Sequence, residues 1–331
     1  MRQFAFFIVL ILLGLLLVRN FGKIPEFIEL LKSLNIWILL LIFPARYGYY
    51  WSSTRYYQHF FALFNKRLTY KELFPGVINM NFLNTVVPSG GLSGAAYFAR
   101  QYESKITGRQ SYLAQFFWYI ATAVSLVTVL AGSFLVLFFS NSIIQVSFRL
   151  TLIFISVLLA LAIVAIVVTL NPFLFKKLLF ILTRPANWIL KLVKRDMLNE
   201  THINRFVDSY HDLITMFSKH PRRAIRPLLD AFLCIVFEMA SIFVIFLAFG
   251  EFVNPGIIGG AYVLALIASA LSVFTAGVGV YEATMVAIFV ALGVSFGLAF
   301  SVTTVYRLIA FWLFIPVGLY FYKRHALDEE D

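Results

Sequence analysis

Three asparagines that precede a proline and a pair of glycines form the first group of residues that could bind a ligand. Asn79, Asn81 and Asn84 are followed by Pro88-Ser89-Gly90-Gly91 within an otherwise apolar stretch. Proline removes a backbone donor and breaks a helix, while glycine lets a ligand or another backbone approach closely. Amides exposed at the start of the next half-helix can bind an anionic group such as phosphate. The pattern predicts either an anion site at Asn84, Pro88, Ser89, Gly90 and Gly91, or a tight helix crossing built from small residues.

A second group of small residues is followed by a carboxylate. Gly277 and Gly279 come just before a predicted helix start, and Glu282 falls in the first turn of that helix. Glu282 could simply cap the helix and complement its dipole. A carboxylate in an apolar environment is costly, however, so it should face the protein interior and have a partner. Arg307 is the lone basic residue deep within the last apolar run, and we expect it to pair with Glu282.

Further charged residues lie inside apolar runs. Arg46 follows Pro44 and either faces the interior or extends its long side chain to the surface. Asp230 and Glu238 share roughly one face of a helix. Asp230 is nearer the end of its run and is expected at the interface. Glu238 is deeper, which makes Glu238 and Glu282 the candidates for an ion-pair or proton-carrying role.

The composition places all these residues on membrane helices. Of the 331 residues, 61% are hydrophobic and only 13% are charged, and the mean hydropathy is +0.87. Soluble domains contain about 25% charged residues. At about 20 residues per crossing, the chain has room for about eight transmembrane segments, some of them broken or re-entrant. We predict an all-α polytopic membrane protein, a single domain over 1–331, with apolar runs at Phe4–Val18, Leu34–Trp51, Tyr112–Phe139, Phe148–Leu170, Leu228–Phe249 and Gly297–Tyr322.

Charge placement predicts the orientation of these segments. Most of the 27 Lys and Arg residues lie at 55–74, 97–110 and 171–227 and near the termini. The positive-inside rule therefore puts these segments and both termini in the cytoplasm, in a multi-pass protein of the cell membrane. The net charge of +11 then reports orientation, and we expect no binding to nucleic acid.

Two weaker apolar stretches are interrupted by small and polar residues. Val77–Ala96 has predicted cytoplasmic loops on both sides, so it should enter the membrane from inside and return there. Ile257–Leu292 begins after an outside turn and is either a re-entrant pair or two short spans with a half-helix. On the re-entrant alternative the two breaks approach the midplane from opposite faces, which predicts an inverted repeat.

The basic segment 171–227 is too charged to span a membrane, and we predict that it contains an amphipathic helix. Such a helix either lies on the cytoplasmic membrane surface or packs beneath the bundle. Its apolar residues recur at three- and four-residue steps, namely Ile203, Phe206, Val207, Tyr210, Leu213, Ile214 and Phe217.

The sequence contains no arrangement of residues that indicates catalysis. There is no nucleophile–base set, phosphate-binding loop, dinucleotide fingerprint or cluster of metal ligands. Cys234 is the only cysteine, which excludes an internal disulfide. We therefore expect no catalytic residue, no metal site and no cofactor.

The two broken segments together resemble a known family. Asn84-x-x-x-Pro88-Ser89-Gly90-Gly91, with Gly277-Val278-Gly279-Val280-x-Glu282 and Arg307, is similar to the lysylphosphatidylglycerol synthase transmembrane-region family, a flippase-like family also called UPF0104. The resemblance extends over essentially the whole chain. In bacterial multiple-peptide-resistance proteins, such a domain moves aminoacylated phosphatidylglycerol between leaflets, and a separate soluble domain transfers the amino acid to the lipid.

The chain departs from the family pattern in two ways. Thr275-Ala276 stands where the family has Pro-Gly, so the second helix break should depend on Gly277 and Gly279. In addition, no segment resembles the soluble synthase domain. A phosphatidylglycerol lysyltransferase activity would therefore have no catalytic apparatus here.

The resemblance implies a lipid translocase that binds an anionic or aminoacylated phospholipid such as lysyl-phosphatidylglycerol. The first-break residues, with Gly277, Gly279 and Glu282, would line a polar cavity for the head group. Arg46 and Arg307 would complement the lipid phosphate, and the two breaks would let the cavity open to either leaflet in turn. The alternatives are a membrane component of a lipid-modifying aminoacyltransferase or glycosyltransferase, working with a separate enzyme, and a scaffold without transport.

Overall fold

In the computed structural model, the regular secondary structure of the described residues is helical. No strand occurs among the described residues, in agreement with the predicted all-α class. The predicted spans Phe4–Val18 and Phe148–Leu170 lie outside the described residues. The described residues are 29, 31–87, 91–140, 171, 173–174, 176–177, 200–219, 221–271, 279–316 and 318–320. Their helices are α3 (Ile36–Leu39), α4 (Ile42–Leu63), α5 (Tyr70–Val86), α6 (Leu92–Gln101), α7 (Gly108–Phe139), α10 (Glu200–Lys219), α11 (Pro221–Ala248), α12 (Pro255–Leu271), α13 (Val280–Ala291), α14 (Phe296–Arg307) and the π-helix η3 (Leu308–Trp312).

Three helices within the described residues are long and apolar enough to cross a membrane. They are α7, α11 and the continuous helix Phe296–Tyr320, which contains α14 and η3. α12 and α13 are apolar but shorter. The chain is thus a helical membrane protein, while the predicted number of about eight segments stays a prediction.

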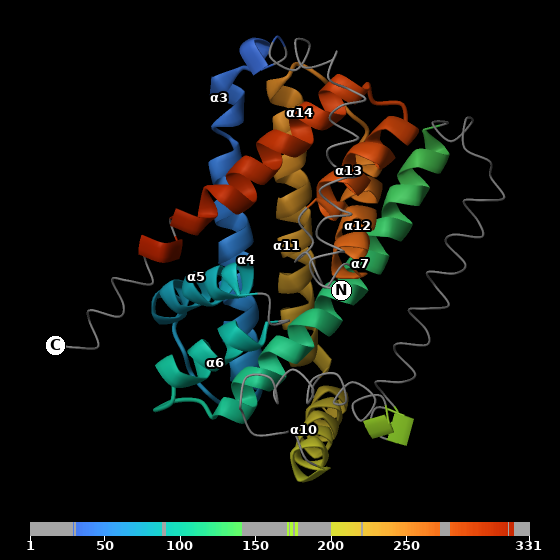
Figure 1. Cartoon of the computed structure of the whole chain (residues 1–331). Coiled ribbons are helices and arrows are strands. Elements are labelled where there is room, and N and C mark those ends of the chain that lie inside the picture. Colours follow the sequence, from blue (N-terminus) through green and yellow to red (C-terminus); the bar gives the residue numbers. More distant parts are fainter. Residues whose placement is uncertain are drawn as a thin grey trace, which may run out of the picture.

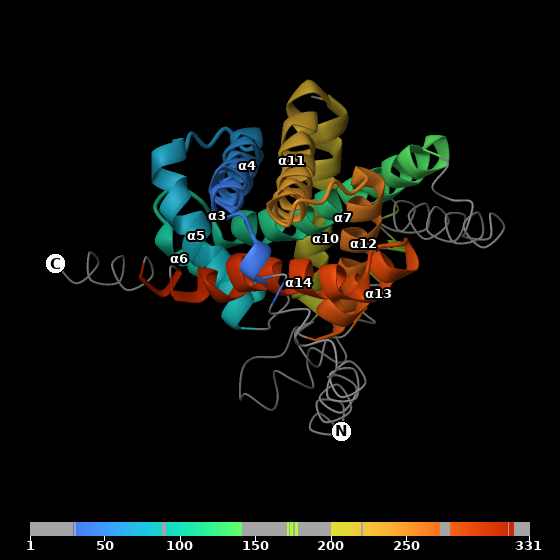
Figure 2. The same ribbon diagram turned by 90° about the horizontal axis from the view of Figure 1, so that it is seen from above.

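The pair of helices α4 and α11 forms the centre of the described structure. These two helices lie side by side along the length of the bundle, and α7 and α14 run obliquely across them (Figures 1 and 2). Gly48 of α4 leaves room for the ring of Phe237 of α11, because a Cβ at this position would collide with that ring. The two backbones can therefore approach closely at this level.

α4 extends well beyond the predicted end of its span at Trp51. The polar run Ser52-Ser53-Thr54, which resembles the end of a membrane segment, is fully buried, and Thr54 Oγ1 donates to the Tyr50 carbonyl at 2.8 Å. The residues that follow are buried aromatics, so helix packing continues to Leu63. The segment 55–63 is therefore helical and was wrongly predicted to be a loop. The rings concerned are Tyr56, Tyr57, Phe60 and Phe61, which pack against α6 and α7.

Both predicted helix breaks are present. α5 ends at Val86 and α6 begins at Leu92, while α12 ends at Leu271 and α13 begins at Val280. In each case a glycine with positive φ precedes the second helix, Gly91 at 83° and Gly279 at 86°. A side chain with a Cβ would be strained at either position, which explains why glycine is used there. Both breaks therefore share one feature, a glycine of positive φ directly before the second helix.

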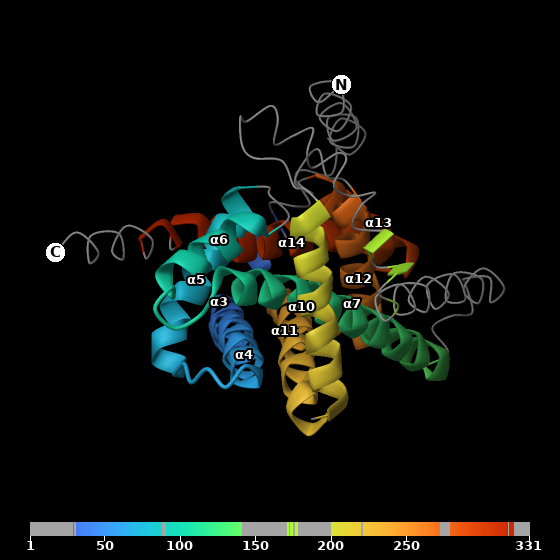
Figure 3. The ribbon, with the colours of Figure 1, turned by 90° about the horizontal axis from the view of Figure 1, so that it is seen from below.

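The amphipathic helix predicted in segment 171–227 is α10, and it packs beneath the bundle. Val207, Tyr210 and Leu213 are buried against α7 and α11, and the rings of Tyr210 and Phe116 meet edge to face at 5.5 Å. Figure 3 shows α10 lying across the lower ends of α7 and α11. The apolar face of α10 is therefore explained by contact with the bundle, which was the second of the two predicted alternatives. Asp208, His211 and Asp212, on the opposite face, are exposed.

α11 begins earlier than the span predicted at Leu228–Phe249. Its first residue is Pro221, and Pro227 lies inside the helix. Proline suits the first position of a helix, because the N–H that it lacks would have no partner there. Residues 221–227, assigned from their charge to a loop, thus belong to a helix whose exposed first turns carry Arg222, Arg223 and Arg226.

We expect Gly256→Ala to destabilise the contact between α12 and α7. A Cβ at residue 256 would lie 2.7 Å from the Ser133 carbonyl oxygen, a backbone atom that cannot simply rotate away. Overpacking of this kind costs about 1–3 kcal/mol. The thermal midpoint of the purified protein in detergent should fall.

Gly260→Ala is the matched control in the same helix. No described atom lies within 4 Å of a Cβ at residue 260. Alanine also favours helix over glycine by about 1 kcal/mol. Its thermal midpoint should be unchanged or higher, and equal losses in the two variants would contradict the described crossing.

Candidate functional site

A cavity of about 300 Å³ lies where α4, α5, α11, α12, α13 and α14 meet. It receives residues from both broken helix pairs, because α5 belongs to the first pair and α12 and α13 belong to the second. The predicted site residues Arg46, Glu238 and Arg307 all line it. The remaining lining residues are Tyr49, Tyr50, Asn81, Thr85, Tyr262, Leu266, Ser269, Tyr281, Tyr306, Ala310, Phe311 and Phe314.

Arg46 and Glu238 form a buried ion pair across the central crossing. Arg46 Nη1 donates to Glu238 Oε2 at 2.5 Å, and only 13% and 9% of the two side chains are exposed. The hydroxyl of Tyr306 donates to the same carboxylate oxygen at 2.7 Å. The guanidinium also lies 4.9 Å from the ring centroid of Tyr49. Arg46 therefore faces the interior and does not extend to the surface.

Arg307 and Glu282 form a second ion pair, as expected from the sequence. Arg307 Nε donates to Glu282 Oε1, and the backbone N–H of Gly279 donates to Glu282 Oε2 at 2.6 Å. Glu282 is thus both the cap of α13 and the partner of Arg307, so the two roles considered separately are combined. The Arg307 guanidinium lies between the rings of Tyr281 and Phe311, at 4.8 and 4.5 Å from their centroids.

The helix that carries Arg307 changes its winding directly after that residue. η3 covers Leu308–Trp312, and the N–H of Leu313 donates to the Leu308 carbonyl at 2.8 Å, a step of five residues. Such π turns are rare and occur frequently at functional sites. Here the wider turn carries Phe311, which covers one face of the Arg307 guanidinium.

The first helix break has a structural role in the described residues. Asn84 Oδ1 accepts a hydrogen bond from the Gly94 N–H at 2.9 Å, so the side chain of α5 caps the start of α6. A Cβ at Gly94 would collide with the Asn84 carboxamide. Neither Asn84 nor Gly91 lines the cavity, and α5 contributes Asn81 and Thr85 in their place. Pro88, Ser89, Gly90 and Gly277 lie outside the described residues.

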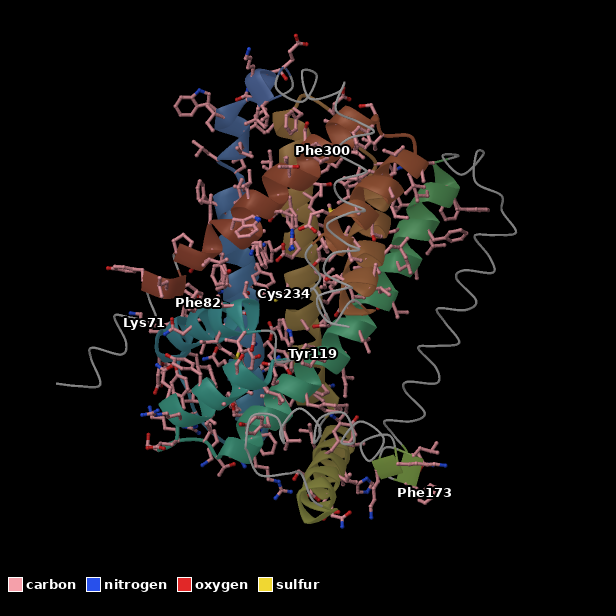
Figure 4. The ribbon with its side chains drawn as sticks, viewed as in Figure 1. Lys71, Phe82, Tyr119, Phe173, Cys234 and Phe300 are labelled. Atoms are coloured by element: carbon pink, nitrogen blue, oxygen red, sulfur yellow. The ribbon has the colours of Figure 1, made fainter. Side chains whose placement is uncertain are left out.

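Asp230, which we expect at the membrane interface from its position near the end of an apolar run, is buried against α4. It is 6% exposed, and its Oδ2 lies 2.5 Å from Nδ1 of His59 on α4. Cys234, halfway between Asp230 and Glu238 on α11, approaches the Tyr49 carbonyl at 3.6 Å and lies between the two helices (Figure 4). Because α4 extends past Trp51, it reaches the level of Asp230 and supplies a partner there.

The tyrosines of the cavity were not identified from the sequence. Five of them line it, from four different helices. A buried tyrosine hydroxyl usually has a hydrogen-bond partner. Tyrosines within apolar runs were therefore the sequence feature that could have indicated polar groups in the interior. Tyr281 and Tyr306 also directly precede Glu282 and Arg307 in the sequence. The remaining three are Tyr49, Tyr50 and Tyr262.

The broken apolar helices and the paired charges in one cavity define a polytopic membrane protein with a polar internal site. Residues 3–318 match the model of the lysylphosphatidylglycerol synthase TM region, so the chain belongs to that family. A UPF0104 membrane protein of Methanothermobacter thermautotrophicus is 27% identical over 141 residues, which is 41% of this chain and 42% of that relative. The alignment thus covers less than half of the relative. No solved structure matches the chain.

We expect Glu238→Ala to destabilise the protein strongly. The substitution leaves the buried Arg46 guanidinium without its carboxylate, and breaking a buried pair in this way costs about 3–5 kcal/mol. Unfolding in denaturant should reveal this loss. The double variant Arg46→Met/Glu238→Met should recover part of it, because neither charge then remains.

Lys105→Ala is the control for charge removal in general. Lys105 pairs with Glu72, but 48% and 28% of these side chains are exposed. Exposed pairs contribute about 0–1 kcal/mol. Similar losses for Glu238→Ala and Lys105→Ala would contradict the described burial of the central pair.

Proposed function

We propose that this protein binds the head group of an anionic or aminoacylated phospholipid in the central cavity and moves it between membrane leaflets. The observation that carries the proposal is the presence of two arginines, from α4 and α14, at one cavity of about 300 Å³. Ligand-binding pockets in proteins have volumes of about 300–1,000 Å³ and contain a few polar groups that orient the ligand. Charged side chains within membrane helices mark substrate pathways by default, because they are too costly to keep without a role.

The chemistry of the cavity favours a phosphodiester head group. Arginine presents several donors in a rigid fork that matches phosphate geometry. Both guanidinium groups are already oriented, Arg46 by Glu238 and Arg307 by Glu282 and by the rings on either side. The side chains of Asn81, Thr85 and Ser269 add neutral hydrogen-bonding groups for the rest of a head group.

The position of the cavity between the two broken helix pairs supports movement of the bound group. Short half-helices joined by glycines can tilt relative to one another more readily than a continuous helix can. Motion of one pair would open the cavity toward one leaflet, and motion of the other pair would open it toward the opposite leaflet. The family name connects the chain to lysylphosphatidylglycerol, which makes that lipid the first to test.

Leaflet exchange in vesicles tests this function. The purified chain is reconstituted with a lysyl-phosphatidylglycerol probe carrying a head-group label that an external reagent can quench. Wild-type protein should accelerate exchange over protein-free vesicles. Arg307→Gln should slow it by about tenfold or more, since a hydrogen bond to a charged group contributes about 1.5–3 kcal/mol.

Glu282→Ala should also slow exchange, because Arg307 loses the carboxylate that positions it. Lys105→Ala should behave as wild type, because Lys105 pairs with Glu72 and neither residue lines the cavity. Wild-type exchange no faster than in protein-free vesicles would overturn the proposal. Formation of an aminoacylated or glycosylated lipid from an activated donor would instead identify the chain as part of an enzyme.

A further inference from the structure

The two ion pairs of the cavity differ in how firmly each carboxylate is held. Glu282 has both oxygens engaged, one by Arg307 and one by the Gly279 N–H at 2.6 Å, and it lies in the first turn of α13. The N-terminus of a helix stabilises a negatively charged side chain through the helix dipole. Glu238 lies in the interior of α11, and Arg46 and Tyr306 both donate to one of its oxygens, Oε2.

Among the described residues, each arginine at the cavity is paired with one glutamate. Arg46 and Arg307 are matched by Glu238 and Glu282, and the other groups that face Glu238 are neutral phenols and a thiol. A lipid phosphate bound in the cavity would add one negative charge next to the carboxylate of Glu238, which lines it. An uncompensated charge in a buried membrane site is costly, so binding is stronger if one carboxylate becomes neutral. The titratable groups near Glu238 are Arg46, Tyr49 and Tyr50 on α4, Cys234 on α11, Tyr262 on α12, Tyr281 on α13, and Tyr306 and Arg307 on α14.

We infer that Glu238 takes up one proton when an anionic head group binds, so that lipid and proton occupy the cavity together. This inference rests on the proposed function of the same cavity. When Arg46 turns from Glu238 to the phosphate, the Tyr306 hydroxyl is the donor that stays with Glu238 among the described residues, and Glu238 faces a second anion. Protonation then restores the charge balance, and the carboxyl O–H can donate to a phosphate oxygen.

Glu282 does not take up this proton. Its hydrogen bond from Gly279 and its place at the start of α13 remain when Arg307 engages the phosphate. It also does not line the cavity, so the phosphate meets Glu238 directly. The site thus contains one fixed carboxylate and one that exchanges its partner.

Binding of a short-chain lipid as a function of pH tests the inference. Dihexanoyl-phosphatidylglycerol is titrated into the full-length protein in detergent from about pH 5 to 8, where its phosphodiester stays ionised. Wild-type affinity should fall with rising pH by up to about tenfold per pH unit, as linkage to one proton requires. Calorimetry in buffers of different ionisation enthalpy should give an uptake approaching one proton per lipid.

Glu238→Gln should bind with an affinity that does not depend on pH. This variant keeps His59, which lies next to Asp230 and could also bind a proton. It therefore separates a pH dependence caused by Glu238 from one caused by His59. Tyr306→Phe preserves the Arg46–Glu238 pair but removes a hydrogen bond to the ionised carboxylate, which favours the protonated form. Its loss of affinity should therefore begin at higher pH than in wild type, a directional shift that a purely structural role does not predict.

The outcomes separate the inference from the function on which it rests. Lipid binding by wild type without pH dependence, or proton uptake that persists in Glu238→Gln, would overturn the proton role while leaving a head-group site. A Tyr306→Phe profile shifted to lower pH would overturn it as well. Failure of wild type to bind the lipid at any pH would overturn the proposed function itself.

Discussion

The ion pair between Arg46 and Glu238 is the constraint on which the central part of the structure depends. Two opposite charges at the crossing of α4 and α11 must stay together, because neither is stable alone in a buried site. The close approach permitted by Gly48 lets the two side chains reach each other. Tyr306 then ties α14 to the same carboxylate, so three helices share one polar contact.

The two helix breaks solve a related problem with backbone geometry. Each places a glycine with positive φ before a short helix, and each is held by a side chain that satisfies exposed amides there. In the first pair the side chain is the neutral Asn84, which closes the hairpin. In the second it is Glu282, which also holds Arg307. One break is therefore structural within the described residues, and the other connects directly to the cavity.

The ion pairs of the cavity connect these features to the proposed transport. In the proposed function, an anion binds when the site rearranges its ion pairs. Glu238, the less firmly held of the two carboxylates, then changes its partner. If binding of lipid is linked to binding of a proton, a proton gradient could bias the direction of movement. Rigid capping of Glu282 and exchangeable pairing of Glu238 would then have separate roles in one cycle.

Composition and periodicity alone determined the helical membrane class, the two breaks, the amphipathic helix and the pairing of Glu282 with Arg307. These follow from local rules: apolar runs, glycine and proline, three- and four-residue steps, and the need of a charge in an apolar run for a partner. Tertiary structure decided four further features. They are the length of α4, the burial of Asp230 with His59, the capping role of Asn84 and the placement of five tyrosines at the cavity. They depend on which helix faces which, and residues as distant as Arg46 and Glu238 become neighbours only through packing.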